Sequence, residues 1–349
     1  MNIVYDDIIY SLQKCGGGSV YWSEVTQSNT NIKILRIVYD SAKNNQLYPK
    51  ALFEQSVVKS SVFLQIKRFL PIKIKKWKNA SFIFHSSYYR YSNNKNACNI
   101  TTIHDFTDEI YGKGILSFIR KFRKKITVAH SKGVICISNN TLKDFKHYYP
   151  KYKGFIEVIH NGYDRDSYYL MPNFTKKNKI LFVGARGGYK RFDLAVKIAS
   201  KFSESKFVIV GGGDLNNSEK ELLERTLRNR YEKIGYISND ELRNLYNEAF
   251  FLCYPSEYEG FGIPIIEAQA CGCPVVCQMN SSLPEVGGTA LVYFAEKELD
   301  SEDCHFFQLN DPFFYKQKVE EGLINVMRFS WDKTRKEVYT FYEKVLNYE

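Results

Sequence analysis

The chain alternates short apolar runs with longer segments in which apolar residues recur at helical spacing. Short apolar runs are typical of strands buried on both faces, and the helical spacing is typical of amphipathic helices. The predicted strands are NIVYDDII at residues 2–9, then 31–38, 81–86, 99–105, 133–138, 155–161, 179–184, 206–212, 231–237 and 250–255. The predicted helices include one that begins at Val20, then 139–149, 191–202, 239–249, 263–271 and a last one over 331–346. This alternation predicts an α/β fold of parallel sheets with helices on both faces.

The strand and helix pattern starts again after residues 167–179, which lack clear periodicity and include Pro172. We place an inter-domain linker there, and 349 residues are enough for two domains with separate cores. The expected N-terminal domain covers residues 1–168 together with a crossing helix at 331–349. The expected C-terminal domain covers residues 169–330.

Composition narrows the class of protein. An apolar content of 44% and a charged content of 25% are those of a soluble globular protein. No apolar run approaches the roughly 18 residues of a membrane span, and we expect no signal peptide, which favours a cytoplasmic location. The eight cysteines show no paired CxxC spacing, so packing explains them better than zinc or disulfides.

The stretch FFLCYPSEYEGFGIPIIEAQACGCPVV combines two carboxylates with a glycine-rich turn. Glu259 precedes the predicted helix and Glu267 lies on it. Gly260 and Gly262 leave backbone N–H groups open to an anion at the helix N-terminus. Two acids beside a phosphate-binding turn suit a ligand with hydroxyls on both sides of a diphosphate, such as a nucleotide-sugar. The alternative is a surface helix with ordinary solvated acids.

The segment from Glu259 to Glu267, with ACGCPVV and then SSLPEV after it, resembles the Glu-x7-Glu signature of retaining GT-B glycosyltransferases of family 4, also called group 1. The resemblance runs from Tyr5 to Leu346. It implies an α/β, GT-B fold: two Rossmann-like domains facing a central cleft, with a C-terminal helix that crosses back to the first domain. It also implies a retaining transfer of a hexose from a nucleotide-sugar to an acceptor hydroxyl, with no cofactor and no metal required.

The resemblance implies a role for each part of this signature. Glu259 would hold hydroxyls of the donor sugar, and Glu267 would hold the ribose hydroxyls. The backbone of the turn would orient the sugar and the phosphate, and it comprises Gly260, Phe261, Gly262 and Ile263. No residue stands out as a covalent nucleophile, which fits the same-face internal return usually proposed for this family.

A second motif, FVGARGGYKR, is a strand that runs into a glycine loop and a helix. The spacing from Gly184 does not match the dinucleotide fingerprint GxGxxG. Arg186 and Lys190 would neutralise a leaving nucleoside diphosphate, a role that the family gives to an arginine and a lysine in this loop. A solvent-exposed basic helix start is disfavoured, because cations fit poorly at that end of the dipole. Arg191 stands where relatives often carry asparagine, and we assign it no role.

Two glycine turns resemble the family's pocket for the base. One is Gly211-Gly-Gly-Asp after a predicted strand, and the other is GYISNDE from residue 235. The expected contacts are Gly211, Gly212 and Ile237. Glycine turns are common in proteins. These two support a binding pocket only because of their order in the chain relative to Arg186 and Glu259.

Two motifs in the first half complete the expected site. CGGGS resembles the family's first-domain glycine loop, which closes over the diphosphate and sugar through Gly16, Gly17 and Gly18; the alternative is a simple turn. TTIHD ends a strand in His104, which in the family faces the cleft near the donor sugar; the alternative is a structural hydrogen bonder. His85 is a weaker candidate for the cleft. The candidate catalytic residues are therefore His104, Arg186, Lys190 and Glu259.

The net charge of +11 is unevenly distributed. Residues 55–104 contain no Asp or Glu, residues 66–79 mix lysines with large apolar residues, and a basic run at 120–125 follows GILSFI. Such surfaces suit an anionic membrane, so we expect the first domain to dock on the inner face of the membrane. A merely solvated basic face is the alternative. Nucleic acid is not expected as a partner, because no helix-turn-helix, zinc-finger or RRM pattern is present.

The donor and the acceptor are less well defined. YDDIIYSLQKCGGGSVYW and SSLPEV are similar to segments of enzymes that build bacterial O-antigen, many of them mannosyltransferases. This favours GDP-mannose, with UDP-sugars open, and a lipid-linked or oligosaccharide acceptor. The alternatives are a non-catalytic nucleotide-sugar-binding module, which would not need His104, and a basic nucleic-acid-binding protein. A dehydrogenase or epimerase would require the missing fingerprint.

Overall fold

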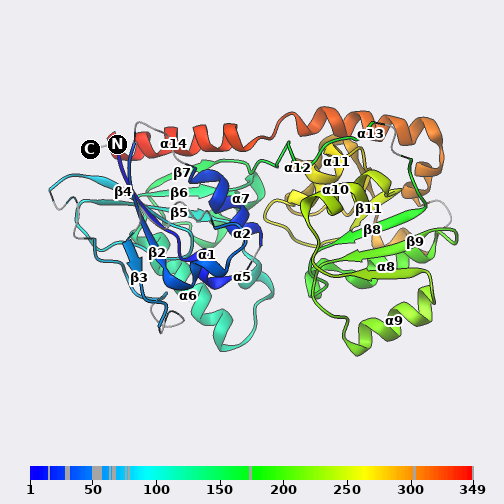
Figure 1. Ribbon diagram of the computed structural model, residues 1–349, viewed down its shortest axis with the longest axis horizontal. Helices are drawn as coiled ribbons and strands as arrows, with labels where there is room; N and C mark the ends of the chain where they lie inside the picture. Colours follow the sequence, from blue (N-terminus) through cyan, green and yellow to red (C-terminus); the bar gives the residue numbers. More distant parts are fainter. Residues whose placement is uncertain are drawn as a thin grey trace. The chain divides into compact units, whose positions relative to one another are not determined.

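The computed structural model describes residues 1–14, 16–27, 32–48, 57–62, 64, 68–74, 77, 79–172, 175–301 and 304–347. The chain forms two compact units (Figure 1). Unit 1 comprises Met1–Asn161 together with Trp331–Glu349, and unit 2 comprises Gly162–Ser330. The division between the units falls earlier in the chain than the boundary expected between residues 168 and 169.

Unit 1 contains a parallel sheet, in which the described strands follow the order β3-β2-β1-β4-β5-β6-β7. The strand order reverses between β1 and β4, as in a doubly wound sheet. The strands are β1 (Asn2–Asp6), β2 (Lys33–Tyr39), β3 (Val57–Lys59), β4 (Phe82–Ser86), β5 (Ala97–Ile103), β6 (Gly133–Cys136) and β7 (Phe155–Val158).

The helices of unit 1 include one from the far end of the chain. The α14 helix packs against α2 and β4, with Val338, Phe341, Tyr342 and Val345 buried (Figure 1). The predicted return of the last helix to the first domain is therefore confirmed. The helices are α1 (Ile9–Leu12), α2 (Gly17–Val25), α5 (Thr107–Tyr111), α6 (Gly114–His130), α7 (Asn139–Tyr148) and α14 (Trp331–Asn347).

Unit 2 is built on a second parallel sheet, with the described strands in the order β10-β9-β8-β11-β12-β13. Here the order reverses between β8 and β11. The strands are β8 (Lys179–Val183), β9 (Lys206–Val210), β10 (Tyr231–Ile234), β11 (Phe251–Tyr254), β12 (Val275–Cys277) and β13 (Leu291–Tyr293).

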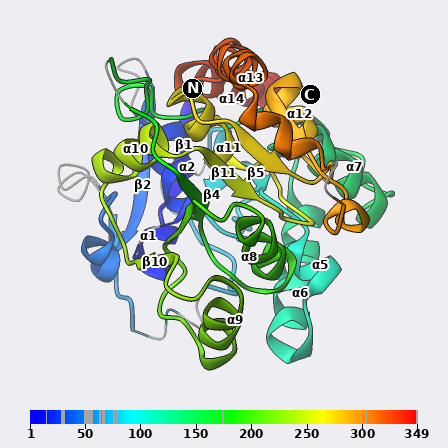
Figure 2. The same ribbon diagram turned by 90° about the vertical axis from the view of Figure 1, so that its right-hand side faces the viewer.

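Helices cover both faces of the second sheet (Figures 1 and 2). On one face α8 contacts α9, β9 and β11, and on the other α11 contacts α10, α12 and α13. The helices are α8 (Phe192–Ser200), α9 (Asn217–Leu227), α10 (Asn239–Glu248), α11 (Ile263–Ala270), α12 (Leu283–Gly287) and α13 (Pro312–Val326). Short 3-10 helices occur at Asp40–Asn44, Gly188–Lys190, Gly288–Ala290, Glu296–Glu298 and His305–Asn310.

Burial follows the apolar runs of the sequence. Every residue of β4, β6, β11 and β12 is buried, as expected for central parallel strands with helices on both faces. In unit 2 a core cluster joins Phe182, Phe207 and Phe251 to Phe192 on α8. A separate cluster in unit 1 joins Val4, Ile37 and Phe84. Each unit therefore has its own core, and the predicted α/β class with two Rossmann-like domains is confirmed.

Two predicted boundaries in the first unit are wrong. The first strand, predicted over residues 2–9, ends at Asp6, and α1 begins at Ile9. At the end of this strand, Asp6 and Asp7 form buried ion pairs with arginines from distant segments. The helix predicted to begin at Val20 begins at Gly17.

Among the described residues, no helix is both long and apolar enough to cross a membrane. The seven described cysteines are free and buried, and Cys15 lies outside the described residues.

Candidate functional site

The carboxyl ends of β8 and β11 in unit 2 bring three candidate residues to one edge of the sheet. Arg186 and Lys190 follow β8, and Glu259 follows β11. These strands are neighbours at the point where the strand order reverses. Open α/β sheets bind ligands outside the carboxyl ends of the strands at this point. The loops after β8 and β11 are therefore the first place to look for a binding site.

Lys190 and Glu259 form an ion pair at this edge. Lys190 Nζ donates to Glu259 Oε1 at 2.5 Å, and both side chains are largely buried, with 17% and 12% exposed. The ammonium also lies 5.4 Å from the centre of the Tyr254 ring. Burial and the neighbouring Glu259 raise the pKa of the Tyr254 phenol well above its usual value. The site therefore holds a cation and an anion side by side, with a neutral phenol next to them.

Two serines hold the loop that carries Glu259. The backbone N–H of Glu259 donates to Ser281 Oγ at 2.9 Å, and Ser282 Oγ donates to the carbonyls of Glu259 and Phe261, each at 2.9 Å. Sequence reasoning noted SSLPEV as a motif but gave these serines no role. The two serines are more than 20 residues from this loop in the sequence, so no local signal identifies them.

The helix that follows this loop begins as predicted. Gly262 precedes α11 with φ of +100°, a left-handed conformation that favours glycine, and Pro264 lies in the first turn. The first N–H groups of a helix lack partners within the helix, so they attract anions. The Phe261 ring is buried against Phe329, with ring centres 5.7 Å apart, so only its backbone faces the turn. Ile263 is the first residue of the helix.

Glu267 lies on α11, partly buried. Tyr246 Oη donates to Glu267 Oε2 at 3.3 Å, and burial raises the pKa of the Glu267 carboxyl to about 7. At neutral pH this group is therefore divided between the acid and the carboxylate. It can both accept and donate a hydrogen bond, which suits recognition of ligand hydroxyls.

Arg186 is directed at a neighbouring loop. Its Nη1 donates to the carbonyl of Gly211 at 3.0 Å, and its Nη2 donates to the carbonyls of Gly213 and Asp214 at 3.3 and 2.7 Å. Its Nε donates to Glu219 Oε1 at 3.0 Å. The sequence led us to expect a charge presented to a diphosphate, whereas the described contacts hold the glycine loop after β9.

The residues expected to form a base pocket lie at the same edge of the sheet. Gly211 and Gly212 follow the carboxyl end of β9, and the partly buried Ile237 follows β10. Gly212 has φ of +74°, and a Cβ there would lie 2.5 Å from Arg186 Nη1 and 2.8 Å from the Gly184 carbonyl oxygen. Glycine at residue 212 is therefore needed for the loop to pack against Arg186.

Unit 1 has a pocket of about 280 Å³ that contains two more of the expected residues, His104 and Gly18. The His104 ring packs edge-on against Tyr21 with ring centres 4.8 Å apart. Burial lowers the pKa of His104 to about 4, so the imidazole is neutral at pH 7 and can act by hydrogen bonding only. Gly16 and Gly17 lie just before Gly18, at the start of α2.

His85, the weaker histidine candidate, is part of the core of unit 1. It is fully buried, its Nδ1 is 2.5 Å from Tyr342 Oη on α14, and its Nε2 is 3.0 Å from Thr102 Oγ1. Burial lowers the pKa of His85 to about 3. Both ring nitrogens are engaged, so His85 connects β4 to α14 and is not a site residue.

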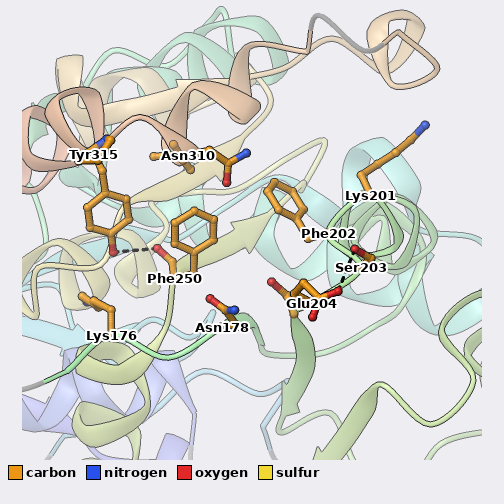
Figure 3. A pocket seen from close by; sticks show the side chains of 12 residues that line it. Lys176, Asn178, Lys201, Phe202, Ser203, Glu204, Phe250, Asn310 and Tyr315 are labelled. Carbon is orange, nitrogen blue, oxygen red and sulfur yellow. Dashed lines mark hydrogen bonds between the residues drawn. The ribbon is translucent and has the colours of Figure 1, made fainter.

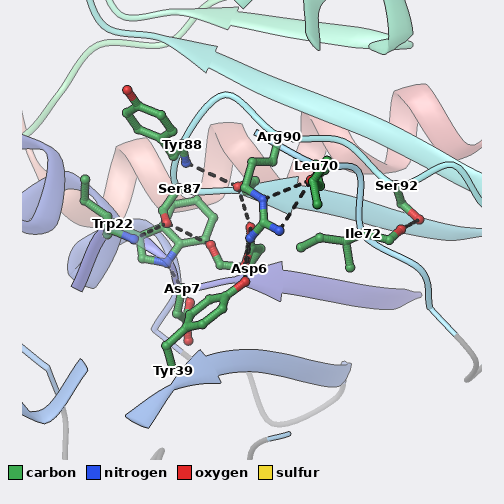
Figure 4. A network of polar contacts seen from close by, with 12 residues as sticks. Asp6, Asp7, Trp22, Tyr39, Leu70, Ile72, Ser87, Tyr88, Arg90 and Ser92 are labelled. Atoms are coloured by element: carbon green, nitrogen blue, oxygen red, sulfur yellow. Dashed lines mark hydrogen bonds and ion pairs between the residues drawn. The ribbon is translucent and has the colours of Figure 1, made fainter. Parts of the chain in front are cut away.

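Two buried aspartates, Asp6 and Asp7, lie at the carboxyl end of β1 in unit 1, where the strand order reverses (Figure 4). Asp6 pairs with Arg90 at 3.0 Å, and Asp7 pairs with Arg36 at 2.7 Å. Trp22 Nε1 donates to Asp7 Oδ1 at 2.6 Å, which attaches α2 to the sheet. Sequence reasoning missed this network because both arginines are distant in the sequence. Asp7 therefore anchors Trp22 of α2, which lines the pocket that contains His104.

A cavity of about 700 Å³ opens at the opposite edge of the sheet in unit 2 (Figure 3). It is lined by residues that precede β8, β9 and β11, among them Asn178, Phe202 and Phe250. This is the amino edge of the strands, away from Lys190 and Glu259. This cavity, which is larger than the pocket beside His104, is therefore not at the site that the motifs predict.

In the part of the chain that the structure describes, no cluster of three or more His, Cys, Asp or Glu residues could hold a metal ion.

Comparison with known proteins gives a family match to part of the chain. Residues 171–297 match the model of the family described as glycosyl transferases group 1. Over 125 residues, 35% of this chain and 33% of the relative, the chain is 37% identical to O-antigen chain mannosyltransferase B of Escherichia coli. The matches cover between 33% and 62% of the length of the first curated relatives.

Solved structures match nearly the whole chain. Sucrose-phosphate synthase from Thermosynechococcus elongatus superposes with a TM-score of 0.72 at 15% identity, covering 99% of both chains. Anabaena HepE in complex with UDP-glucose superposes with a TM-score of 0.70 at 15% identity, covering 99% of this chain and 100% of that one. At such identities these likenesses concern the fold alone, and the predicted GT-B fold class is confirmed.

Proposed function

We propose that the chain is a retaining glycosyltransferase that moves a hexose from a nucleotide-sugar to a lipid-linked or oligosaccharide acceptor in surface polysaccharide synthesis. The observation that carries the proposal is the Lys190–Glu259 pair at the carboxyl edge of β8 and β11, beside the N-terminus of α11. The family match over residues 171–297 includes these residues and supports the proposal.

Four groups form the proposed donor site, and each has a separate role. Lys190 would leave Glu259 and pair with the diphosphate, stabilising the negative charge that develops as the glycosidic bond breaks. Glu259 would then accept hydrogen bonds from the sugar hydroxyls. Glu267 would bind the ribose hydroxyls, and the N–H groups at the start of α11 would face a phosphate. The ion pair would thus keep both charges compensated until the donor enters.

Arg186 and His104 take supporting roles in this proposal. Arg186 would stabilise the diphosphate by turning one N–H from the glycine loop, whose base-binding contacts would be Gly211, Gly212 and Ile237. His104 would act as a neutral hydrogen-bonding wall of the pocket in unit 1, because its lowered pKa of about 4 removes its charge at pH 7. The glycine loop from Gly16 to Gly18 would adjust that pocket.

The donor is proposed to be GDP-mannose, with a UDP-sugar as the second candidate. The name of the Escherichia coli relative, an O-antigen chain mannosyltransferase, supports mannose. The UDP-glucose complex of HepE supports a nucleotide-sugar donor, and it is the reason that a UDP-sugar is the second candidate.

Calorimetry of the full chain with GDP, UDP and their sugar conjugates tests this function. We expect one of these nucleotides to bind. Glu267→Gln should lower the affinity for that nucleotide, whereas the control variant Lys197→Gln should bind it as tightly as the wild type. Release of nucleoside diphosphate from the sugar conjugate would then separate an enzyme from a binding module. If none of these nucleotides binds to the folded protein, the proposed function is wrong.

We also propose that α6 in unit 1 docks on an anionic membrane. Residues 114–130 contain no acid, and Ile115, Leu116, Phe118 and Phe122 are more than half exposed. Phe118 and Phe122 border a groove of about 570 Å³ together with Lys121 and Lys125. Apolar side chains beside cations suit the interface of an anionic bilayer, where each cation adds about 1 kcal/mol. The other basic segment, residues 66–79, lies partly outside the described residues.

Co-sedimentation with vesicles tests the docking surface. The wild type should bind vesicles with phosphatidylglycerol more than vesicles of phosphatidylcholine alone. The double variant F118E/F122E should lose that binding. Phe313→Glu is a matched control, because Phe313 is 85% exposed on α13 of unit 2. Binding that does not depend on anionic lipid, or that survives in F118E/F122E, would rule out this surface.

A further inference from the structure

Arg191 is the residue of the FVGARGGYKR motif that the proposed function does not use. It lies between the 3-10 turn Gly188–Lys190 and α8, as the C-cap of the first and the N-cap of the second, with φ of 47° and ψ of 52°. A residue other than glycine in this left-handed region costs about 1–2 kcal/mol, and asparagine tolerates it better than most. Some contact must therefore hold an arginine in this conformation.

The side chain of Arg191 meets three carboxylates from three segments. Nη1 and Nη2 each donate to Glu296 at 2.9 Å, a bidentate pair, and Nη1 also donates to Glu257 at 2.8 Å. Nη2 donates to Asp193 at 3.0 Å. These partners raise the pKa of the guanidinium. Because three carboxylates compensate its charge, Arg191 is a poor candidate for a direct contact to phosphate.

The same contacts connect the two loops of the candidate site. Glu257 lies in the loop after β11, and its N–H donates to the carbonyl of Tyr189 at 2.8 Å. Tyr189 directly precedes Lys190, and Glu257 lies two residues before Glu259. The backbone hydrogen bond and the Arg191–Glu257 ion pair therefore both join the loop that carries Lys190 to the loop that carries Glu259.

We propose that Arg191 is a positioning residue that holds Lys190 at the distance from Glu259 needed to receive a diphosphate. It acts through Glu257 and Glu296 and touches no ligand itself. The inference rests on the proposed function, because it assigns Lys190 to the diphosphate. It predicts a specific defect: loss of Arg191 should weaken recognition of the diphosphate and leave recognition of the nucleoside unchanged.

Arg191→Asn is the variant of choice, because asparagine keeps the left-handed backbone and removes the ion pairs. Titration of the full chain with GDP or UDP, whichever binds, and with guanosine or uridine gives the two affinities. We expect R191N to weaken the diphosphate about tenfold and the nucleoside less than twofold. Glu296→Gln, which keeps Arg191, should give a smaller loss in the same direction. Lys197→Gln removes one ion pair of α8, to Asp300, and should change neither affinity.

A double-mutant cycle with Lys190→Ala completes the test. If Arg191 acts through Lys190, R191N should cause no further loss of diphosphate affinity in the K190A background. Three results would overturn the inference: R191N that binds the diphosphate like the wild type, equal weakening of nucleoside and diphosphate, or additive losses in the cycle. A wild type that binds no nucleotide would instead overturn the proposed function itself.

Discussion

Lys190 Nζ and Glu259 Oε1 lie 2.5 Å apart, although the two residues come from loops after different strands. The contact exists because β8 and β11 are neighbours in the sheet while α8, β9, α9, β10 and α10 intervene in the sequence. Both side chains are largely buried, and each neutralises the charge of the other. A ligand that carries both a diphosphate and hydroxyls can replace both halves of this pair at once.

Replacing Lys190 should therefore harm recognition of the diphosphate more than stability. In Lys190→Ala the site loses a cation, and we expect donor turnover to fall about 100-fold, in line with the loss of one stabilising group at a developing charge. Steady-state kinetics with the sugar conjugate that binds gives this number. Lys190→Arg keeps the charge with a different shape and should recover part of the rate. A K190A enzyme with wild-type turnover would remove Lys190 from the mechanism.

Glu267 should make the stability of the protein depend on pH. Its pKa of about 7 in the fold exceeds the ordinary value of 4.5, so between these values the folded state binds more protons than the unfolded state. The free energy of unfolding should then fall as the pH rises from about 4.5 to 7, by on the order of 2–3 kcal/mol.

The matched comparison for this pH effect is Glu267→Gln, which cannot titrate. Urea denaturation at pH 5 and pH 8 should show wild type losing stability relative to the variant at the higher pH. If the free energy of unfolding changed with pH in the same way for both proteins, the fold would not raise the pKa of the Glu267 carboxyl.

Gly212→Ala should disrupt the loop that Arg186 holds. The added Cβ would lie 2.8 Å from the Gly184 carbonyl oxygen, which cannot move without its strand. Gly213→Ala is the matched control: Gly213 has φ of +72°, but among the described residues no atom beyond its chain neighbours lies within 4 Å of where a Cβ would stand. In thermal denaturation, the free energy of unfolding of G212A should be about 1–3 kcal/mol lower than that of G213A. Equal stability of the two variants would contradict the steric account.

Tyr342→Phe should weaken the attachment of α14 to β4 within unit 1. The Tyr342 hydroxyl lies 2.5 Å from Nδ1 of the buried His85, and its removal would leave a buried ring nitrogen without that partner. We expect a loss of about 1–3 kcal/mol in the free energy of unfolding. Tyr339→Phe, at a less buried position of the same helix, should cost less. An unchanged stability of Y342F would mean that His85 finds another partner.

The sequence predicts best those features that depend on neighbouring residues. The turn before α11 is an example, because Gly262 and Pro264 fix its backbone locally. Short strands are harder: β3, β12 and β13 have three residues each, too few for an apolar pattern to distinguish them from a loop. The long α6 helix is not among the predicted helices, because the sequence shows it first as a basic run.

Side-chain partners distant in the sequence could not be predicted. Nothing local to Asp7 indicates that Arg36 will reach it, and the loop motif around Arg186 does not reveal that its guanidinium binds loop carbonyls. The same holds for Arg191, because its partners Glu257 and Glu296 are 66 and 105 residues away in the sequence. These contacts depend on strand order, which periodicity alone does not define.

The most direct test of the central claim is a crystal structure of the full chain with the nucleoside diphosphate that binds. We expect the diphosphate at the N-terminus of α11, within hydrogen-bonding distance of Lys190, with the ribose hydroxyls on Glu267. A nucleotide bound instead at the opposite edge of the sheet, in the cavity beside Phe250 and Tyr315, would contradict the account.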